Sequence, residues 1–158
     1  MSNVNIKRAV ENIRSGTNAY TPLIEVVVNA IQAIETTERK DGLVEIVINR
    51  THQAELDGSL SEIDGFTVTD NGIGFNAVNR EAFDTLYTAQ KVAEGGKGFG
   101  RFTCLKYFQD VRIRSVFFDE GEYNSRAFSM GMEKEIIVDE VLGKSDISET
   151  GSIVKLKS

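Results

Sequence analysis

The chain has 158 residues, of which 41% are hydrophobic and 27% charged, a balance typical of a folded globular domain rather than a disordered or fibrous chain. Its formal net charge of −6 disfavours contact with phosphate backbones, so we expect no direct nucleic-acid binding by this domain. No apolar run reaches the roughly 18 residues of a membrane-spanning helix, and residues 1–10 lack the apolar core of a secretory signal. These features predict a cytoplasmic protein without membrane contact.

Two helices and two strands are predicted in the first half of the chain. Val4–Ile13 has apolar residues at helical spacing and predicts a short helix. Thr21-Pro22 is interpreted as an N-cap followed by the first helical position of a long helix that continues to about Thr37. Alternating β-branched residues predict strands at Leu43–Asn49 and Phe66–Thr69.

The second half predicts two helices, three strands and one glycine-rich segment. The helices are expected at Asn76–Thr85 and Arg101–Tyr107, and the strands at Val111–Phe118, Tyr123–Met130 and Ser152–Lys157. Ala89–Gly100 contains four glycines and two lysines, a composition typical of a mobile lid. Together the elements predict one α/β domain with mostly antiparallel strands. Because the last strand ends almost at the C-terminus, we expect a domain cut from a longer protein.

A single cysteine, Cys104, and a single histidine, His52, limit the chemistry of the chain. These counts exclude an internal disulfide and a Cys/His zinc cluster. A histidine-dependent nucleophilic site would have to use His52, which lies in the polar stretch Thr51–Ser61 without a nucleophile motif nearby. His52 is therefore interpreted as a loop residue.

A polar stripe on the Tyr20–Thr37 helix is the first candidate functional feature. At about 100° per residue, Glu25, Asn29, Gln32 and Thr36 share one direction. Such a stripe can simply face water. However, this stretch has no Lys or Arg, and the oxygens of Glu25 and Asn29, one turn apart, suit a hard cation or a water. A carboxylate beside a Mg²⁺-binding amide can act as general base toward an attacking water.

The sequence TDNGIGF, Thr69–Phe75, is the second feature and follows a predicted strand. Gly72 and Gly74 allow the backbone to turn sharply and to approach a flat ligand closely. Asp70 supplies an acceptor for an exocyclic amine, which favours adenine over guanine. The same residues can also form an ordinary Asp-Asn-Gly turn, so both interpretations remain open on this motif alone.

The third feature is Gly95–Arg101, GGKGFGR, directly before a predicted helix. Its backbone N–H groups and Lys97 can cradle phosphates. It is not a Walker A loop, because no Lys-Ser/Thr follows the required glycine spacing, and it follows no clear strand as a Rossmann fingerprint should. A protein-kinase catalytic loop is also missing, since His52 is followed by Gln-Ala.

Taken in chain order, these motifs resemble the sequence boxes of the GHKL ATPase superfamily, which includes DNA gyrase, MutL, heat-shock chaperones and sensor histidine kinases. The matching boxes are Glu25-x-x-x-Asn29-Ala30, Asp70-x-Gly72-x-Gly74, Gly96-Lys97-Gly98-x-Gly100 and Gly151-Ser152. The resemblance runs from about Tyr20 to Leu156. It implies that residues 1–158 form one ATP-binding domain, the N-terminal part of a longer protein. The implied Bergerat fold is a two-layer α+β sandwich with a mixed, mainly antiparallel sheet and helices on one face.

The resemblance also implies roles for individual residues. Glu25 polarises the attacking water, Asn29 ligates Mg²⁺ and Asp70 binds the adenine amine. Ala33 lines the base pocket, and the Ser152 hydroxyl supports Asp70 and its water network. The other positions expected to contact ATP are Gly72, Ile73 and Gly74 at the pocket floor, Gly96, Lys97, Gly98, Phe99 and Gly100 over the phosphates, and Lys91 beside them.

The activity implied by the resemblance is Mg²⁺-dependent ATP binding and slow hydrolysis. Glutamate at position 25 resembles the hydrolysing branches, and the GKGFGRF run looks closest to chaperone-like, MutL-like and microrchidia-like ATPases. Nucleotide-gated lid closure and homodimerisation of a longer protein are implied as well. Family ATPases generally need a following transducer domain, so slow turnover is expected of this chain alone. The alternatives are a non-catalytic ATP sensor and, less favoured by Glu25, phosphotransfer to a histidine.

Overall fold

The computed structural model describes residues 18–51, 62–84, 100–131 and 135–158. Besides a helix at residues 77–84, it contains the helices α2 (Tyr20–Glu35) and α4 (Gly100–Tyr107) and the strands β1 (Val44–Arg50), β2 (Ile63–Asp70), β3 (Asp110–Asp119), β4 (Glu122–Met130), β5 (Ile137–Lys144) and β6 (Gly151–Lys157). Within these ranges, every helix is too short or too polar to cross a membrane.

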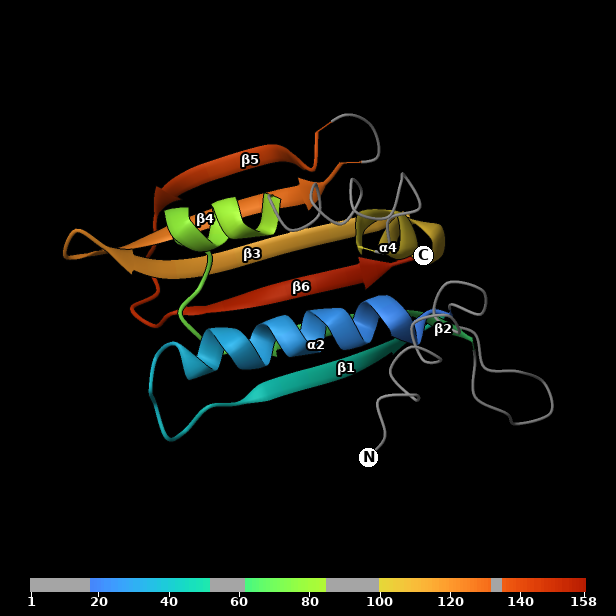
Figure 1. Ribbon diagram of the computed structural model, residues 1–158, viewed down its shortest axis with the longest axis horizontal. Coiled ribbons are helices and arrows are strands. Elements are labelled where there is room, and N and C mark those ends of the chain that lie inside the picture. The colour runs from blue at the N-terminus through green and yellow to red at the C-terminus, as the bar shows by residue number, and fades with distance from the viewer. Residues whose placement is uncertain (1–17, 52–61, 85–99, 132–134) are drawn as a thin grey trace, which may run out of the picture.

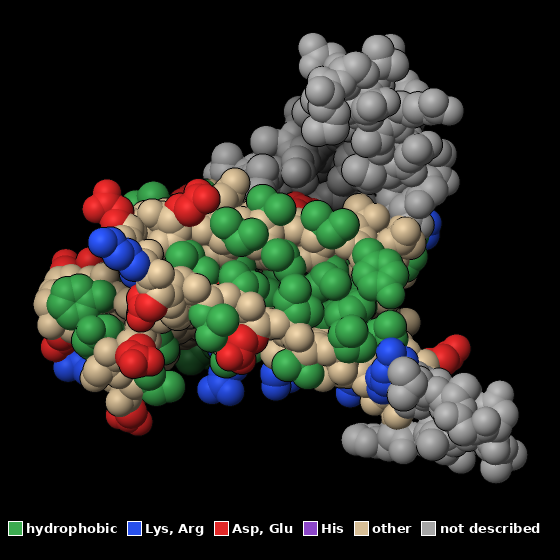
Figure 2. Space-filling model, turned by 90° about the horizontal axis from the view of Figure 1, so that it is seen from below, with side chains coloured by type: hydrophobic (Ala, Val, Ile, Leu, Met, Phe, Trp, Pro, Cys, Tyr) green, Lys and Arg blue, Asp and Glu red, His purple; other side chains and the backbone are tan. Residues whose placement is uncertain are grey.

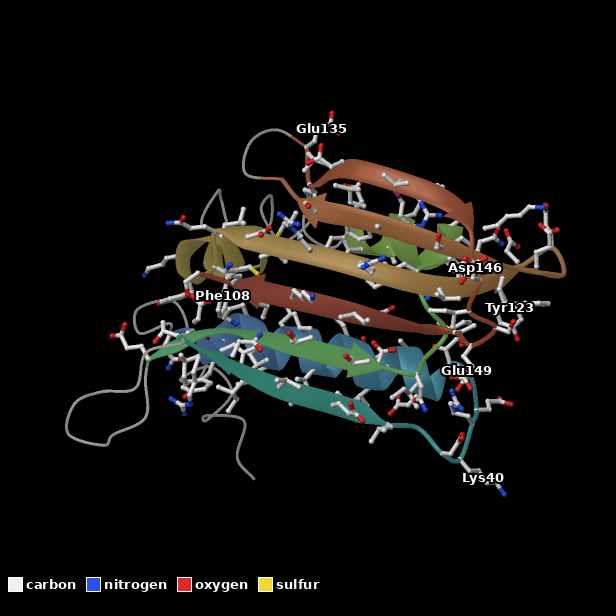
Figure 3. The ribbon with its side chains drawn as sticks, turned by 180° about the vertical axis from the view of Figure 1, so that it is seen from behind. Lys40, Phe108, Tyr123, Glu135, Asp146 and Glu149 are labelled. Atoms are coloured by element: carbon white, nitrogen blue, oxygen red, sulfur yellow. The ribbon has the colours of Figure 1, made fainter. Side chains whose placement is uncertain are left out.

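The six strands form one sheet in the order β1-β2-β6-β3-β4-β5. Every pair of neighbouring strands is antiparallel. The helices lie in a second layer on one face of the sheet (Figure 1), and the view from behind shows the other face without a helix over it (Figure 3). The predicted two-layer α+β sandwich is therefore confirmed, and its mainly antiparallel sheet is wholly antiparallel among the described strands.

The core lies between α2 and the central strands. Phe66 and Val68 of β2 pair with Leu156 and Val154 of β6, and all four are buried on the helix side. Because side chains alternate along a strand, the residue two positions after Val68 and the residue two positions before Val154 also point to the helix side. Those positions are Asp70 on β2 and Ser152 on β6, which also pair with each other. The same alternation that forms the core thus places two polar side chains under α2.

Two elements differ from the sequence prediction. Helix α2 begins at Tyr20, two residues before the predicted first helical position Pro22, and its N-cap is Ala19, which forms no side-chain cap hydrogen bond. The Tyr20 N–H instead donates to the Asn18 side chain at 2.9 Å, just before the helix. Strand β5 was not predicted, since its alternation is interrupted at Asp139, whose φ is +55°, and the register with β4 shifts there. The predicted helix at Val4–Ile13 lies outside the described residues.

Candidate functional site

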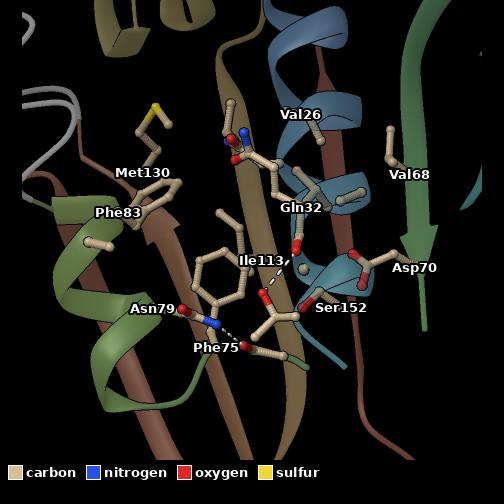
Figure 4. A pocket seen from close by; sticks show the side chains of 18 of the residues that line it. Val26, Gln32, Val68, Asp70, Phe75, Asn79, Phe83, Ile113, Met130 and Ser152 are labelled. Carbon is tan, nitrogen blue, oxygen red and sulfur yellow. Dashed lines mark hydrogen bonds between the residues drawn. The ribbon is translucent and has the colours of Figure 1, made fainter. Parts of the chain in front are cut away.

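A cavity of about 330 Å³ lies between α2, the sheet and the 77–84 helix, a volume within the ordinary range of small-ligand pockets. Its polar lining residues come from α2 and its C-terminal end, from β2, from β6 and from the 77–84 helix, and most of the remaining wall is apolar. The polar side chains are Asn29, Gln32, Thr36, Asp70, Asn79 and Ser152. In Figure 4, Asp70 and Ser152 lie on one side of this space and Phe83 and Met130 on the other.

Asp70 is the charged group in this lining and is only 8% exposed. Its Oδ1 accepts the backbone N–H of Gly72 at 2.8 Å. Burial raises the pKa of the carboxyl to about 6, while the Gly72 hydrogen bond acts in the opposite direction. An acceptor held in an apolar cavity discriminates strongly between ligands that offer a donor there and ligands that do not.

Ser152 belongs to a chain of hydroxyl groups that joins three segments. Its Oγ donates to Ser115 Oγ at 3.1 Å, and Ser115 in turn donates to the Gly151 carbonyl at 3.1 Å. Ser115 also accepts the Phe75 N–H at 2.7 Å. Ser115 was not among the predicted site residues, although a serine at an inward position of the apolar strand β3 is a signal that could have found it. This chain fixes the loop after Asp70 against β3 and β6.

The glycines of the TDNGIGF segment are required by close packing. Gly72 lies against the backbone of Ala33, where a side chain would collide, and the Ile73 N–H donates to the Ala33 carbonyl at 3.0 Å. Gly74 has a φ of +82°, and the Val116 carbonyl occupies the place of its missing side chain. Of the three, Gly74 lines the cavity, whereas Gly72 and Ile73 join the loop to α2. The ordinary-turn interpretation alone does not explain these contacts.

The polar stripe of α2 turns toward the cavity. Asn29, Gln32 and Thr36 line it, together with Ala33. Glu25 lies one turn before Asn29 and is half-buried. Burial raises the pKa of the Cys104 thiol on α4 to about 12, and the nearby negative charge of Glu25 contributes to this rise. Glu25 is therefore at the margin of the cavity, next to a thiol that stays neutral.

The phosphate-side predictions fall mostly outside the described residues. Lys91, Gly96, Lys97, Gly98 and Phe99 belong to that part of the chain, and Gly100 is the first residue of α4. Their roles stay predictions. Among the described residues, no group of three or more His, Cys, Asp or Glu side chains could hold a metal ion.

An ion-pair network that sequence reasoning missed holds the outer wall of the cavity. Arg126 of β4, whose side chain is 7% exposed, donates from Nε to the Phe75 carbonyl at 2.8 Å and from Nη1 to Glu140 of β5 at 2.7 Å. Glu140 also pairs with Arg80 of the 77–84 helix at 3.2 Å. Burial raises the pKa of Glu140, but the hydrogen bonds from Arg126 and Arg80 outweigh it and leave that pKa lowered. The network connects β4, β5, the helix and Phe75.

Glu140→Gln should destabilise the fold by about 2 kcal/mol, because it leaves the buried Arg126 guanidinium without its counter-charge. Urea unfolding at neutral pH measures the change. Glu122→Gln is the matched control, since it removes an exposed ion pair with Lys144 at 3.5 Å, and such pairs contribute about 0 to 1 kcal/mol. Equal effects of the two substitutions would show that the Arg126 network adds nothing to stability.

Comparisons with known proteins give distant similarities to solved structures. No family model matches the chain, and no curated protein matches it. The 43K ATPase domain of Thermus thermophilus gyrase B, solved in complex with an aminocoumarin, is similar with a TM-score of 0.47 and 20% sequence identity. The match covers 99% of this chain and 40% of that chain, so this chain spans less than half the length of its neighbour. A similarity at this distance assigns neither a family nor an activity.

Proposed function

We propose that this chain is a GHKL-type module that binds ATP with Mg²⁺ and hydrolyses it slowly. The observation that carries the proposal is the buried Asp70 carboxylate, opposite Ser152 in the sheet register, at one side of a mostly apolar cavity. Adenine offers an exocyclic amine as donor and flat faces for apolar contact. Guanine presents a carbonyl oxygen at the corresponding place, which would meet the carboxylate as a second acceptor.

The residues at the cavity margin fit a magnesium ion that accompanies the nucleotide. Mg²⁺ is ordinarily held by one or two protein oxygens together with phosphates and waters, not by a dedicated cage of acids. Asn29 lines the cavity, and its side-chain amide oxygen is proposed to hold the magnesium ion. When bound, the ion would offset the negative charge of the phosphates. Glu25, one turn away on the same helix, is proposed as the base that takes a proton from the attacking water.

A non-catalytic ATP sensor is the second candidate function. It is favoured by one observation: Glu25 is not among the residues that line the cavity, although Asn29 and Ala33 of the same helix are. A sensor would use the same adenine site without turnover and would change its partner contacts on binding. Phosphotransfer to a histidine is disfavoured by the glutamate at position 25.

The proposal has two further parts. The Ala89–Gly100 segment closes over the phosphates, and ATP binding gates homodimerisation of a longer protein. The support for association is an exposed apolar surface along α2 and β1 (Figure 2), which includes Ile24, Val28, Ile46 and Ile48. Contiguous apolar surface of this kind commonly marks an interaction site. A second copy of the chain is the proposed occupant.

Calorimetric titration of the chain with ATP and with GTP, both with Mg²⁺, tests the proposal. ATP should bind at least about tenfold more tightly than GTP, because guanine leaves the Asp70 carboxylate facing an acceptor. Adenosine should compete for the same site. Equal binding of the two nucleotides, or no binding of either, would contradict the adenine assignment.

A further inference from the structure

Four basic side chains gather on the open face of the sheet. Although the net charge is −6, two arginines of β3 and two lysines of β6 point away from the helices on the open face of the sheet. Arg112, Arg114, Lys155 and Lys157 are all exposed, while their sequence neighbours on these strands are buried in the core. Strict alternation on adjacent strands therefore concentrates positive charge on one surface of an acidic protein.

The register arranges these cations as a continuous track. Arg112 pairs with Lys155 across β3 and β6, and Lys157 and Arg114 extend the track in opposite directions along the two strands. Residues paired across strands are about 5 Å apart, and successive residues on one face are about 7 Å apart along a strand. Arg112, Lys155 and Lys157 also border a hollow together with Arg50 at the end of β1, where four cations stand against the two carboxylates of Asp64 and Asp110. The track is thus longer than a single anionic group requires.

The positive charge of the track is only partly compensated. Asp110 forms a salt bridge with Arg112 at 2.9 Å, yet the Arg112 side chain remains 67% exposed. Within the described part of the chain, Arg114, Lys155 and Lys157 form no salt bridge. The acidic residues labelled in Figure 3, Glu135, Asp146 and Glu149, lie toward the rim of the sheet.

Neutral hydrogen-bonding groups and an aromatic pair share this face. Thr67 of β2 is paired with Lys155, and Ser129 of β4 is paired with Arg112, so hydroxyl donors flank the cations. Phe118 lies further along β3 on the same face, is exposed, and contacts the ring of Tyr123 at 4.9 Å between centroids. Cations and hydroxyls that track a backbone, with an aromatic side chain nearby for stacking, are the components of a single-strand binding surface.

We propose that the open face of the sheet binds the sugar-phosphate backbone of a single-stranded nucleic acid. Phosphates recur at every nucleotide and suit the planar guanidinium fork of Arg112 and Arg114. An acidic peptide would offer carboxylates at irregular spacing and no bases to stack on Phe118. The site lies on the face opposite Asp70 and is independent of the proposed ATP pocket. The low expectation of nucleic-acid binding came from the net charge, which averages over both faces.

Fluorescence anisotropy of a labelled oligothymidylate with the 158-residue chain tests this proposal. Binding should weaken steeply between about 50 and about 200 mM salt, because neutralised phosphates release counterions. The double variant Arg114→Glu/Lys155→Glu should bind at least about tenfold more weakly and lower the salt slope by about 1 to 2. Arg114→Gln/Lys155→Gln should give an intermediate loss, which separates lost attraction from added repulsion.

Two controls make the outcome decisive. Lys40→Glu makes the same charge reversal as each single substitution of the double variant, at an exposed residue away from the track (Figure 3), and should leave oligonucleotide binding unchanged. Asp70→Asn, or an excess of adenosine, should also leave it unchanged, since neither touches the open face. The proposal is overturned if the wild-type chain does not bind the oligonucleotide, if Lys40→Glu weakens binding as much as the double variant, or if poly-glutamate of equal charge competes equally well. Each of these results would leave the ATP titration unaffected.

Discussion

Asp70→Asn is expected to weaken ATP binding by about 10- to 100-fold, the usual contribution of a hydrogen bond to a charged group. The substitution keeps the shape of the side chain, and an asparagine Oδ1 can still accept the Gly72 N–H that Asp70 accepts at 2.8 Å. What it removes is the negative charge that is proposed to receive the adenine amine. Calorimetry with ATP and Mg²⁺ measures the loss, and the preference for ATP over GTP should shrink with it.

The same substitution should stabilise the chain without ligand at neutral pH. The folded-state pKa of Asp70 is about 6, above the ordinary carboxyl value of 3.8, because burial disfavours the charged form. Between these two values the folded state binds more protons than the unfolded state, so stability falls as pH rises through that window. The loss is on the order of 2 to 3 kcal/mol above it. Asp70→Asn should recover part of this loss at about pH 7 and none at about pH 3.

Asp64→Asn is the matched control for both effects. It makes the same chemical change on the same strand, at a residue outside the cavity lining. ATP affinity should be unchanged in this variant. If Asp70→Asn bound ATP as tightly as the wild type, the adenine site would lie elsewhere. If it instead lost both ATP binding and stability at neutral pH, the carboxylate would be serving the fold and not a ligand.

The strands were predictable where local patterning and tertiary environment agree. The alternation in β2, β3, β4 and β6 predicted four strands, and the structure extends each of them by one or more residues. Strand β5 was missed because it is an edge strand whose pattern breaks at Asp139, and no local signal specifies its pairing with β4. The start of α2 was misplaced by two residues, because the helix begins at Tyr20, before the Thr21-Pro22 signal, where the Tyr20 N–H donates to the Asn18 side chain.

The candidate site was predictable where one element carries the whole signal. Helical spacing on α2 predicted that Asn29, Gln32 and Thr36 share a face, and all three line the cavity. The glycines after β2 predicted a tight loop. The contacts of Ser115 and Arg126 were not predicted, because their shared partner Phe75 is 40 residues away from Ser115 and 51 residues away from Arg126 in sequence. The basic surface on the open face of the sheet was not predicted for a related reason. Composition gives only the sum of the charges, whereas the strand register decides which charged side chains lie together.

Glu25→Gln is expected to reduce ATP turnover by about 10²- to 10⁴-fold while ATP affinity stays close to the wild type, because a glutamine cannot take a proton from water. Glu25 lies half-buried on α2, one turn before Asn29, and is not among the residues that line the cavity with Asp70. In the proposed ATP complex, a group in that position would contribute little to binding of the base and would act at the phosphate end. Phosphate release under single-turnover conditions measures the rate, and calorimetry measures the affinity.

Glu35→Gln, on an exposed turn at the end of the same helix, is the control that should change neither quantity. Turnover in Glu25→Gln at the wild-type rate would remove Glu25 from the proposed chemistry. A wild-type chain that binds ATP without any turnover would favour the sensor, because the proposed adenine contact of Asp70 does not need a base at position 25. The two carboxylates thus separate the two functions: Asp70 tests whether ATP binds, and Glu25 tests whether it is hydrolysed.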